Sequence, residues 1–543
     1  MQYTQKTNTT DITVDADTTH DNQIKAYFIG SGIASLAGAA FLIRDGLFPG
    51  KSIHIFEELK SAGGSLDGAG SAETGYVIRG GRMLEQHYAC TYGLFASIPS
   101  PTDIAKSVKD EIVEFSQKYV SSSRCRLVRD GKKVDVSSFE LNEKDRLDLL
   151  ALIIHSEDSL GDKSIEEWFS TSFFENNFWL MWATMFAFQP WHSAVELKRY
   201  LLRFIQLFPD FNTMGGVWRT PYNQYDSMVL PLFAWLKGEG VQFLLNTEVT
   251  GLDFDIGGSG RAVKNIRYQC DGGNKNIAIA EHDLVFVTLG CMTEGSSLGS
   301  MSTPAILNSK ESGGSWRLWE DIANGRPGFG HPGVFSNHIE QTKWQSFTVT
   351  LNDPAFFAFM EEFTGNAAGT GGLVTLADSN WFMSVVLAHQ PHFINQPENI
   401  FVFWGYALAP DRIGDFVKKP MSECTGKEIL IELFQHLKLG NKAQPIIDAA
   451  ICIPCMMPFI TSQFMPRIKG DRPEVVPFGA KNFAFIGQFC EIPDDVVFTV
   501  EYSVRSAQMA VYALLGIDKD IPPVFKGQHD VGVLLNALKT MYR

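Results

Sequence analysis

The sequence lacks an excess of basic residues. Its 543 residues include 46 Lys and Arg against 61 Asp and Glu, which gives a net charge of −15 at pH 7. Non-specific binding to nucleic acid needs a basic face, so this balance excludes that class of function. The remaining composition, 45% hydrophobic and 20% charged, is ordinary for a globular protein. The length predicts several domains or one large interrupted domain.

A disulfide framework is also missing. The cysteines are scattered without regular spacing, and we therefore expect a reduced, cytoplasmic protein. Cys452 and Cys455 form a CxxC pair, but no thioredoxin-like βαβ setting surrounds it and no second CxxC completes a zinc site. Two buried thiols are favoured over a redox role, and no metal site is predicted. The cysteines are Cys90, Cys125, Cys270, Cys291, Cys424, Cys452, Cys455 and Cys490.

Long, clean hydrophobic runs are absent. Residues 178–195 and 449–466 carry no Lys, Arg, Asp or Glu, but both contain prolines and polar side chains. Neither is an apolar span of ~20 residues, so we expect buried walls instead of transmembrane helices. No signal peptide precedes the first apolar strand, and the polar residues 1–23 are predicted to be a disordered tail.

What the sequence does contain is a strand, a glycine turn, a helix and a second strand directly after that tail. Gly30 allows the turn, and Gly32 lets a pyrophosphate approach the N-terminus of a helix that begins near Ala34. The second strand stops at Glu57 and Glu58, whose carboxylates suit the hydroxyl pair of a ribose. This order predicts a dinucleotide site, and its early position in the chain is frequent in FAD enzymes.

The glycine pattern alone is weak support. Ser35 stands where the fingerprint has its third glycine, while the spacing of 25 residues from Gly32 to Glu57 is near the ~20 expected. An ordinary βαβ unit without a ligand is the alternative. The strand before the turn, the helix after it and the acid in place favour dinucleotide binding.

Later stretches fit the other parts of an FAD site. Gly64 and Ser65 belong to a second glycine-rich loop close to the acid that suits the ribose. Val249 lies in an extended segment, and residues 283–290 form an apolar strand that ends in glycine. Gly487 ends a last buried strand, and Thr499 precedes what we expect to be the final helix, whose N-terminal amides suit the flavin side chain. We predict that all of these residues bind the cofactor.

Together these segments predict an α/β protein with a discontinuous, Rossmann-like FAD-binding fold. Residues 24–100, 225–345 and 470–516 form the FAD-binding domain. Inserted between them are a mainly helical region, 101–224, that lines a substrate channel, and a substrate-binding region, 346–469. Residues 517–543 are predicted to be a C-terminal tail. Three roles are compatible with its aliphatic stretch 531–538: capping the fold, contacting a neighbouring molecule or contacting a membrane surface.

Two further features are ambiguous on their own. Arg79-Gly80-Gly81-Arg82 has the composition of a backbone-close turn beside a ligand, but a surface turn with solvated arginines explains it equally well. Tyr200 lies on an amphipathic helix over residues 194–205, where a tyrosine is usually a core residue with a satisfied hydroxyl.

Several stretches together resemble one family, the fatty acid (oleate) hydratases, also called the myosin-cross-reactive antigen family. The resemblance covers nearly the whole chain after residue 24 and suggests a divergent, shorter member. It implies addition of water across a cis double bond of an unsaturated long-chain free fatty acid. It also implies FAD, with the reduced form favoured, although no net redox occurs. The matching stretches are 64–68, 79–82, 222–225, 404–406 through 419–421, and 486–489.

The resemblance also implies residue roles. Tyr200 corresponds to the proton donor to the alkene, Asn223 and Gln224 to residues near the substrate, and Arg82 to a turn that packs on the flavin. The family glutamate credited with activating water is replaced by Met83, which is not a base near neutral pH. Glu85 is the nearest acid in the sequence.

The family stretch that helps to hold the fatty acid carboxylate also differs in this chain. Its Thr and Asn are here Val386 and Ala388, and its Arg is His389. Carboxylate recognition is therefore expected to shift, toward His389 or His392.

Other functions remain open at this stage. An FAD oxidoreductase or a double-bond isomerase acting on a lipid would use the same glycine turn and Glu57. A fatty-acid-binding flavoprotein with lapsed catalysis is favoured by Met83. Both a monomer and a homodimer are compatible with the sequence.

Overall fold

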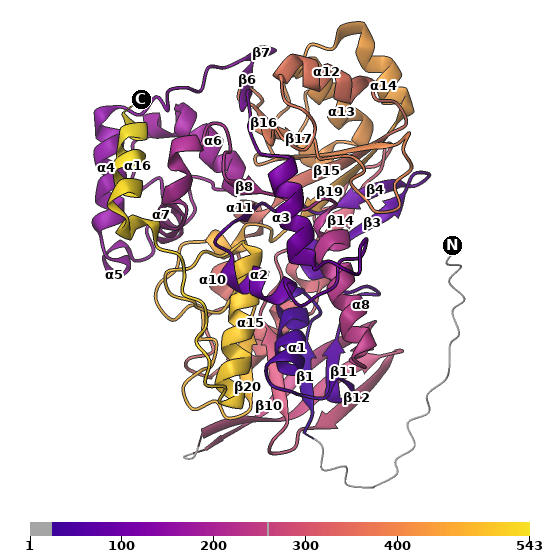
Figure 1. The fold of residues 1–543 in the computed structure, drawn as a ribbon, viewed down its shortest axis with the longest axis vertical. Helices are drawn as coiled ribbons and strands as arrows, with labels where there is room; N and C mark the ends of the chain where they lie inside the picture. Colours follow the sequence, from indigo (N-terminus) through magenta and orange to yellow (C-terminus); the bar gives the residue numbers. More distant parts are fainter. Residues whose placement is uncertain (1–23, 258–259, 543) are drawn as a thin grey trace.

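The computed structural model describes residues 24–257 and 260–542, so the predicted N-terminal tail, 1–23, lies outside the described residues. Three regions are visible in Figure 1. A parallel sheet with its helices occupies the lower part, a large mixed sheet under α12–α14 the upper right, and a group of helices around α4 and α16 the upper left.

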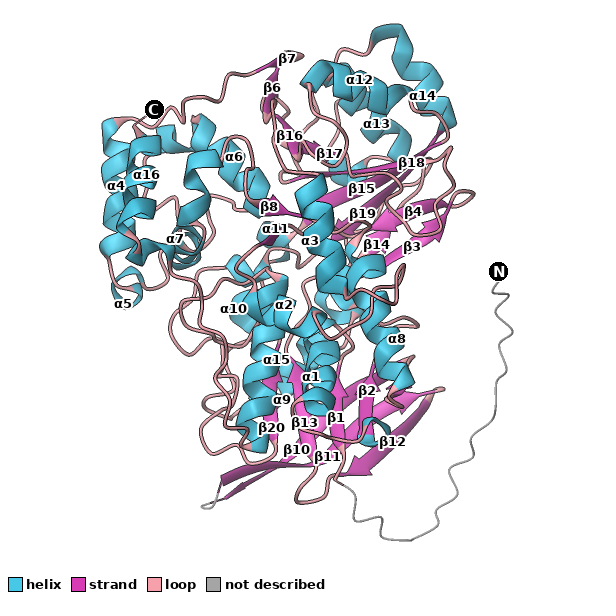
Figure 2. Cartoon of the chain, viewed as in Figure 1, coloured by secondary structure: helices cyan, strands magenta, loops and turns pink. Residues whose placement is uncertain are grey.

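The parallel sheet has the order β20-β13-β1-β2-β9, and every neighbouring pair is parallel. Helices α1 and α15 pack against each other beside it (Figure 2). The approach of α1 to the sheet is close, because a Cβ on Gly38 would lie 2.6 Å from the ring of Phe28. The strands and helices are β1 (Ala26–Ile29), α1 (Ile33–Arg44), β2 (Ile53–Phe56), β9 (Gln242–Leu244), β13 (Leu284–Thr288), β20 (Phe483–Ile486) and α15 (Val500–Leu515).

The five strands come from three distant parts of the chain. The central strand β1 is a fully buried apolar run, and its neighbours β13 and β2 are buried except at Thr288 and His54, as expected for a parallel sheet covered on both faces. The predicted α/β fold, Rossmann-like and discontinuous, is confirmed. An antiparallel sheet of three strands follows β9 in the chain: β10 (Thr247–Gly257), β11 (Gly260–Cys270) and β12 (Gly273–Ala278).

The mixed sheet has eight strands in the order β14-β19-β15-β18-β17-β16-β6-β7. The hairpin of β3 and β4 packs against β15, where the N–H groups of Tyr76 and Ile78 donate to the hydroxyls of Thr350 and Thr348. This contact joins the cofactor-side loops to the mixed sheet. The strands are β3 (Gly68–Ser71), β4 (Gly75–Ile78), β6 (Leu127–Arg129), β7 (Lys132–Lys133), β14 (Ser297–Leu298), β15 (Trp344–Leu351), β16 (Leu373–Leu376), β17 (Met383–Val386), β18 (Phe401–Ala407) and β19 (Ala450–Met457).

The expectation that α15 is the final helix is wrong. The tail after it contains α16 (Val531–Met541), which lies near α4 (Glu143–Ile154) and α7 (Ala194–Arg203) in Figure 1. Arg146 on α4 donates from Nε to the carbonyl of Met541 at 2.8 Å. Buried Ala537 and Met541 belong to the main core, so packing selects the helix that the short aliphatic pattern only allowed.

The remaining elements connect these regions. They are β5 (Leu84–Glu85), α2 (Ala89–Phe95), α3 (Val108–Lys118), α5 (Glu157–Leu160), α6 (Asn177–Phe186), β8 (Val217–Trp218), α8 (Leu230–Gly238), α9 (Ser315–Ala323), α10 (Gly333–Ser336), α11 (Ile339–Thr342), α12 (Ala355–Thr364), α13 (Gly426–His436) and α14 (Ala443–Ala449). Within the described part of the chain, no helix is both long and apolar enough to cross a bilayer. Cys452 and Cys455 are free, buried thiols on β19, as predicted.

Candidate functional site

A cavity of about 1510 Å³, here called the cofactor cavity, lies where β1, β2 and β13 end in loops. Ligands of open α/β sheets bind at this carboxyl edge of the strands. The structure brings together here most of the residues that the sequence predicted to bind the cofactor. They are Gly30, Gly32, Ala34, Glu57, Glu58, Gly64, Ser65, Val249 and Gly487.

The glycine turn leaves a cradle in this cavity. Gly32 is the N-cap of α1 and no side chain of the described residues caps the helix, which leaves its first N–H groups for a ligand. A Cβ on Gly32 would meet no atom within 4 Å, which leaves room for a phosphate at the helix N-terminus. Gly30 has a φ of +89° and accommodates the turn that brings the chain there. These features fit the pyrophosphate of a dinucleotide.

A substitution in the cradle is expected to affect cofactor binding without affecting the stability of the fold. Gly32→Ala is expected to leave the melting temperature of the flavin-free protein unchanged, since the added methyl group meets only open space. FAD binding is expected to weaken by about 10- to 100-fold, because charge-assisted hydrogen bonds of ~1.5–3 kcal/mol are lost when the phosphate is displaced. Titration of the flavin-free protein with FAD measures this.

Gly93→Ala is the matched control, since a Cβ there also meets nothing within 4 Å and Gly93 is outside the residues that line the cavity. Equal FAD affinity in the Gly32→Ala variant and the wild type would contradict the assignment of the cradle.

Acidic side chains gather around the cofactor cavity. Glu57 is held at the end of β2: its Oε2 accepts from the N–H and the hydroxyl of Ser31 at 3.0 and 2.6 Å, and its Oε1 accepts from Leu59 N–H. Burial and the neighbouring Glu248 raise the pKa of Glu58. Burial, followed by repulsion from Glu58, raises the pKa of Glu294 to about 8. Glu294 is therefore mostly protonated at neutral pH and able to donate a hydrogen bond.

The sequence prediction missed Glu248 and Glu294. Glu248 directly precedes the predicted Val249, and Glu294 follows the strand β13 by six residues, so proximity to predicted strand ends was the available signal. Neither spacing matches a known fingerprint. Only the fold shows that four carboxylates face one cavity.

A second cavity of about 920 Å³ is largely apolar and is here called the Arg219 cavity. Val386, Ala388 and Trp404 are among the apolar residues of its wall. The polar and charged side chains that line it include Arg82, Thr184, Arg219, Thr220, Tyr222, Gln224, His389, His392 and Tyr406. Among the predicted substrate residues, Gln224 and His389 therefore reach this cavity.

A third cavity of about 600 Å³, the Tyr200 cavity, holds the predicted proton donor in its wall. It shares Gly81, Arg82, Met83, Met185 and Phe498 with the Arg219 cavity. The turn that the sequence singled out is thus the boundary between the two cavities.

Tyr200 is buried, and its hydroxyl donates to the carbonyl of Val497 at 2.6 Å. Burial raises the pKa of Tyr200 well above its usual range, and the positive charge of Arg82 opposes that shift. The ring packs edge-on against Phe186 and Phe188. The hydroxyl is therefore a protonated donor at neutral pH in a dry, aromatic environment.

Arg82 links the apolar cavities to the cofactor side. Burial lowers the pKa of its guanidinium to about 10, and its contacts are the Met292 sulfur at 3.8 Å and the Phe498 ring at 4.8 Å. Met292 also lines the cofactor cavity. Gln224 fixes the turn by donating from Nε2 to the Arg82 carbonyl at 3.2 Å. Arg82 and Met83, predicted to bind the cofactor, thus line the apolar cavities instead of the cofactor cavity.

Glu85 lies in the wall of the Tyr200 cavity and is almost fully buried. Its carboxylate accepts from His87 N–H at 3.0 Å and from Gln206 Nε2 at 3.3 Å, and lies 3.4 Å from Arg203 Nη1. The His87 ring also contacts it. The side chain is therefore a carboxyl group held by several partners in the wall of the cavity that also contains Tyr200.

Two predicted site residues have other surroundings. Asn223 is buried outside the cavity walls, and its backbone and amide N–H groups both donate to the His392 carbonyl. Thr499 caps α15 and lines the Tyr200 cavity, not the cofactor cavity. Asn223 therefore positions the segment that carries His392, and Thr499 positions the start of α15.

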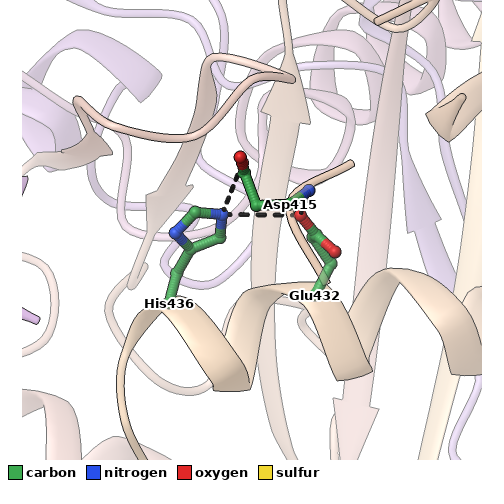
Figure 3. A group of neighbouring side chains, drawn as sticks. All are labelled: Asp415, Glu432 and His436. Carbon is green, nitrogen blue, oxygen red and sulfur yellow. Dashed lines mark hydrogen bonds and ion pairs between the residues drawn. The ribbon is translucent and has the colours of Figure 1, made fainter. Parts of the chain in front are cut away.

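A polar cluster away from these cavities has a structural explanation (Figure 3). Glu432 on α13 accepts backbone N–H groups of Phe416 at 2.9 Å and Val417 at 2.8 Å, and His436 Nε2 lies 3.3 Å from Asp415 Oδ2. Burial opposes the ionisation of Glu432, but His436 and these N–H donors hold its pKa below the usual value. The cluster clamps the loop after β18 onto α13.

The parallel sheet order, the uncapped glycine turn and the acids at the strand ends define a protein with a Rossmann-like fold of the FAD type, whose cofactor cavity fits a dinucleotide. The model of the MCRA family matches residues 23–512. The chain belongs to the MCRA family, as its motifs predicted.

Two curated relatives cover most of the chain. An oleate hydratase of Streptococcus pyogenes serotype M49 (strain NZ131) is 43% identical over 532 residues, which are 95% of this chain and 89% of the relative. A linoleate hydratase of Lactiplantibacillus plantarum is 34% identical over 565 residues, covering 95% of this chain and 98% of the relative. A crystal structure of an oxidoreductase from Methanosarcina mazei aligns with a TM-score of 0.48 at 12% identity, over 90% of this chain and 100% of that one.

Proposed function

We propose that this protein is an FAD-dependent hydro-lyase that adds water to a cis double bond of an unsaturated long-chain free fatty acid, with no net redox. The observation that carries the proposal is the junction at residues 81–83, where an apolar cavity with a cationic wall meets the cavity of the buried Tyr200. The two curated relatives are named oleate hydratase and linoleate hydratase. A cytoplasmic location and a monomer or homodimer complete the proposal.

Tyr200 is the proton donor in this proposal. Its O–H leaves the Val497 carbonyl and protonates one alkene carbon, which forms a C–H bond and leaves positive charge on the neighbouring carbon. Arg82 favours the release of this proton, because its charge lowers the pKa of Tyr200. The reduced cofactor, when bound, supplies electron density that stabilises a developing cation.

Water attacks the second carbon, and its proton must leave. Met83 lies between the cavities but has only a weak acceptor sulfur, so it does not take that proton. Glu85 is the carboxylate of the Tyr200 cavity, and we assign to it the holding of the water. The proton lost by the water finally restores the Tyr200 phenol, so that the net reaction is addition of one water molecule.

Anaerobic incubation of the flavin-reduced protein with oleate in heavy water tests the function. A hydroxy fatty acid with one carbon-bound deuterium is the expected product. Turnover that requires oxygen, forms peroxide and yields no hydroxy acid would instead identify an oxidoreductase. Migration of the double bond without a hydroxyl group would identify an isomerase.

Met83→Glu tests whether the missing carboxylate limits the reaction. We expect the rate of hydration to rise by about 10- to 100-fold, since a positioned general base contributes typically 10²–10⁴-fold and Glu85 already supplies part of this. Product formation under saturating oleate is the measurement, and Met83→Gln is the control for shape and polarity. Equal rates in both variants would contradict a base at this position. Activity in Met83→Glu with none in the wild type would identify the natural chain as a binder.

A further inference from the structure

Arg219 is a cation in the wall of an apolar cavity. Its Nη1 donates to the Gly369 carbonyl at 2.9 Å, while its backbone carbonyl accepts from the Ser116 hydroxyl at 3.2 Å. Within residues 24–257 and 260–542, no carboxylate oxygen lies within 4.0 Å of the guanidinium nitrogens of Arg219, so the group forms no ion pair there. A guanidinium has five N–H donors, so most of the hydrogen-bonding capacity of Arg219 is left for a ligand.

The buried guanidinium of Arg126 adds to the positive charge of Arg219. Arg126 donates to the Phe211 carbonyl at 2.7 Å and, in the same described part of the chain, has no carboxylate partner either. Burial lowers the pKa of Arg126 to about 10, and the charge of Arg219 lowers it further. Burying an uncompensated charge costs several kcal/mol, and here a guanidinium behind the cavity wall interacts with the guanidinium of Arg219 in that wall. Backbone carbonyls accept one hydrogen bond from each group, but a negative charge in the cavity would stabilise the pair further.

The histidines expected to hold the carboxylate do not supply that charge. Burial lowers the pKa of His392 to about 4 and also lowers the pKa of His389. Both imidazoles are therefore neutral at pH 7. The other two positions of the stretch, Val386 and Ala388, present only apolar side chains to the cavity. What remains on this side of the cavity is Arg219 with neutral donors such as Tyr222.

We propose that Arg219 is the carboxylate anchor of the fatty acid and thereby determines the specificity of the site for free acids. The inference rests on the proposed function for the identity of the ligand. An extended bound acid would place its carboxylate at the guanidinium, with the alkyl chain along the apolar wall toward Met83 and the Tyr200 cavity. Arg82, the other unpaired arginine of this wall, lies at the junction of the cavities and faces the reacting part of the chain.

The test compares a saturated acid with its uncharged analogue. Dissociation constants of myristate and 1-tetradecanol are measured on the FAD-loaded protein by displacement of a fluorescent fatty acid. We expect Arg219→Gln to weaken myristate binding by about 10- to 100-fold, since hydrogen bonds to charged groups contribute ~1.5–3 kcal/mol. Binding of the alcohol is expected to change less than about threefold, and Arg219→Lys to retain part of the preference for the acid.

Arg129→Gln is the matched control, because Arg129 is exposed at the end of β6 and is not among the residues that line the cavities. Equal loss of acid and alcohol binding in Arg219→Gln, or no loss of either, would overturn the proposal. Saturated ligands are not hydrated, so this result is independent of whether the wild type hydrates oleate. Failure of hydration with an intact preference for acids would sink the proposed function alone.

The wild type provides a second measurement that needs no variant. Burial lowers the pKa of Arg219 only to about 10, so the group stays charged and the affinity for myristate should be constant from pH 6.5 to pH 8.5. An anchoring histidinium would instead lose affinity about tenfold per pH unit above its pKa, and that result would overturn the proposal. The charged and titratable groups around the site are Glu111 and Lys118 on α3, Arg126 directly before β6, Arg82, Tyr222, His389, His392 and Tyr406 on β18.

Discussion

Tyr200→Phe is expected to lower the rate of fatty acid hydration by about 10³-fold while leaving FAD and fatty acid binding unchanged. The substitution removes only the hydroxyl that donates to Val497, and the ring keeps its aromatic contacts in the cavity. General acid catalysis contributes typically 10²–10⁴-fold, which sets the size of the effect. Single-turnover product formation in heavy water separates the chemical step from product release.

Tyr502→Phe is the control for this prediction. Its hydroxyl also donates to a buried backbone carbonyl, that of Cys490 at 2.7 Å, but Tyr502 is not among the residues that line the three cavities. The control should lose some stability and keep the rate. A Tyr200→Phe variant with the wild-type rate would refute the assignment of the proton donor, whatever happens to its stability.

The second large effect concerns Glu294 and the pH dependence of stability in the flavin-free protein. The pKa of Glu294 is raised from 4.5 to about 8, so the folded state binds its proton more tightly than the unfolded chain does. Between those two values the unfolded state releases the proton first, and the free energy of unfolding falls as the pH rises. The full loss is roughly 4–5 kcal/mol, reached above pH 8.

Glu294→Gln keeps the shape of the protonated side chain and removes this titration. We expect the variant to be more stable than the wild type, by a difference that widens by about 3 kcal/mol from pH 5.5 to pH 9. Denaturant unfolding at several pH values measures it, and Glu166→Gln, at an exposed position, is the control for a lost surface charge. A constant difference across the pH range would show that Glu294 does not titrate as inferred.

The acids of the cofactor cavity show which site residues a local sequence pattern predicts and which it does not. The glycine turn and Glu57 were predictable, because a strand, a turn, a helix and a strand in immediate succession bring their ends together whatever the rest of the chain does. Glu248 and Glu294 reach the same cavity from β10 and from the loop after β13. Their convergence depends on the order of strands in the sheet, and that order is a property of long-range pairing.

Residue roles show the same division. The motif at residues 79–83 marked a ligand-facing turn, but its sequence did not reveal that the turn separates two apolar cavities. Thr499 was expected near the cofactor from its place before a helix, and it lines the Tyr200 cavity because α15 starts beside that wall. In the sequence, Arg219 is only one of several hydrogen-bonding residues in the polar loop 215–225. Its significance is the lack of an anionic partner, which only three-dimensional neighbours can establish.

From sequence alone, the class of fold, the cofactor-binding turn and membership of the MCRA family followed, since these rest on short contiguous segments that carry their own geometry. The tertiary structure decided which side chains share a cavity. Four acids line the cofactor cavity, Tyr200 and Glu85 line a second one, and Arg219, which has no carboxylate partner among the described residues, lines a third together with Met83. The physical reason is that distant segments must pack around a group before it is buried. That packing then shifts its pKa and determines which charged or hydrogen-bonding partners it has. The segment 517–543 is the simplest example, because the short helix α16 within it is stabilised by packing on the core.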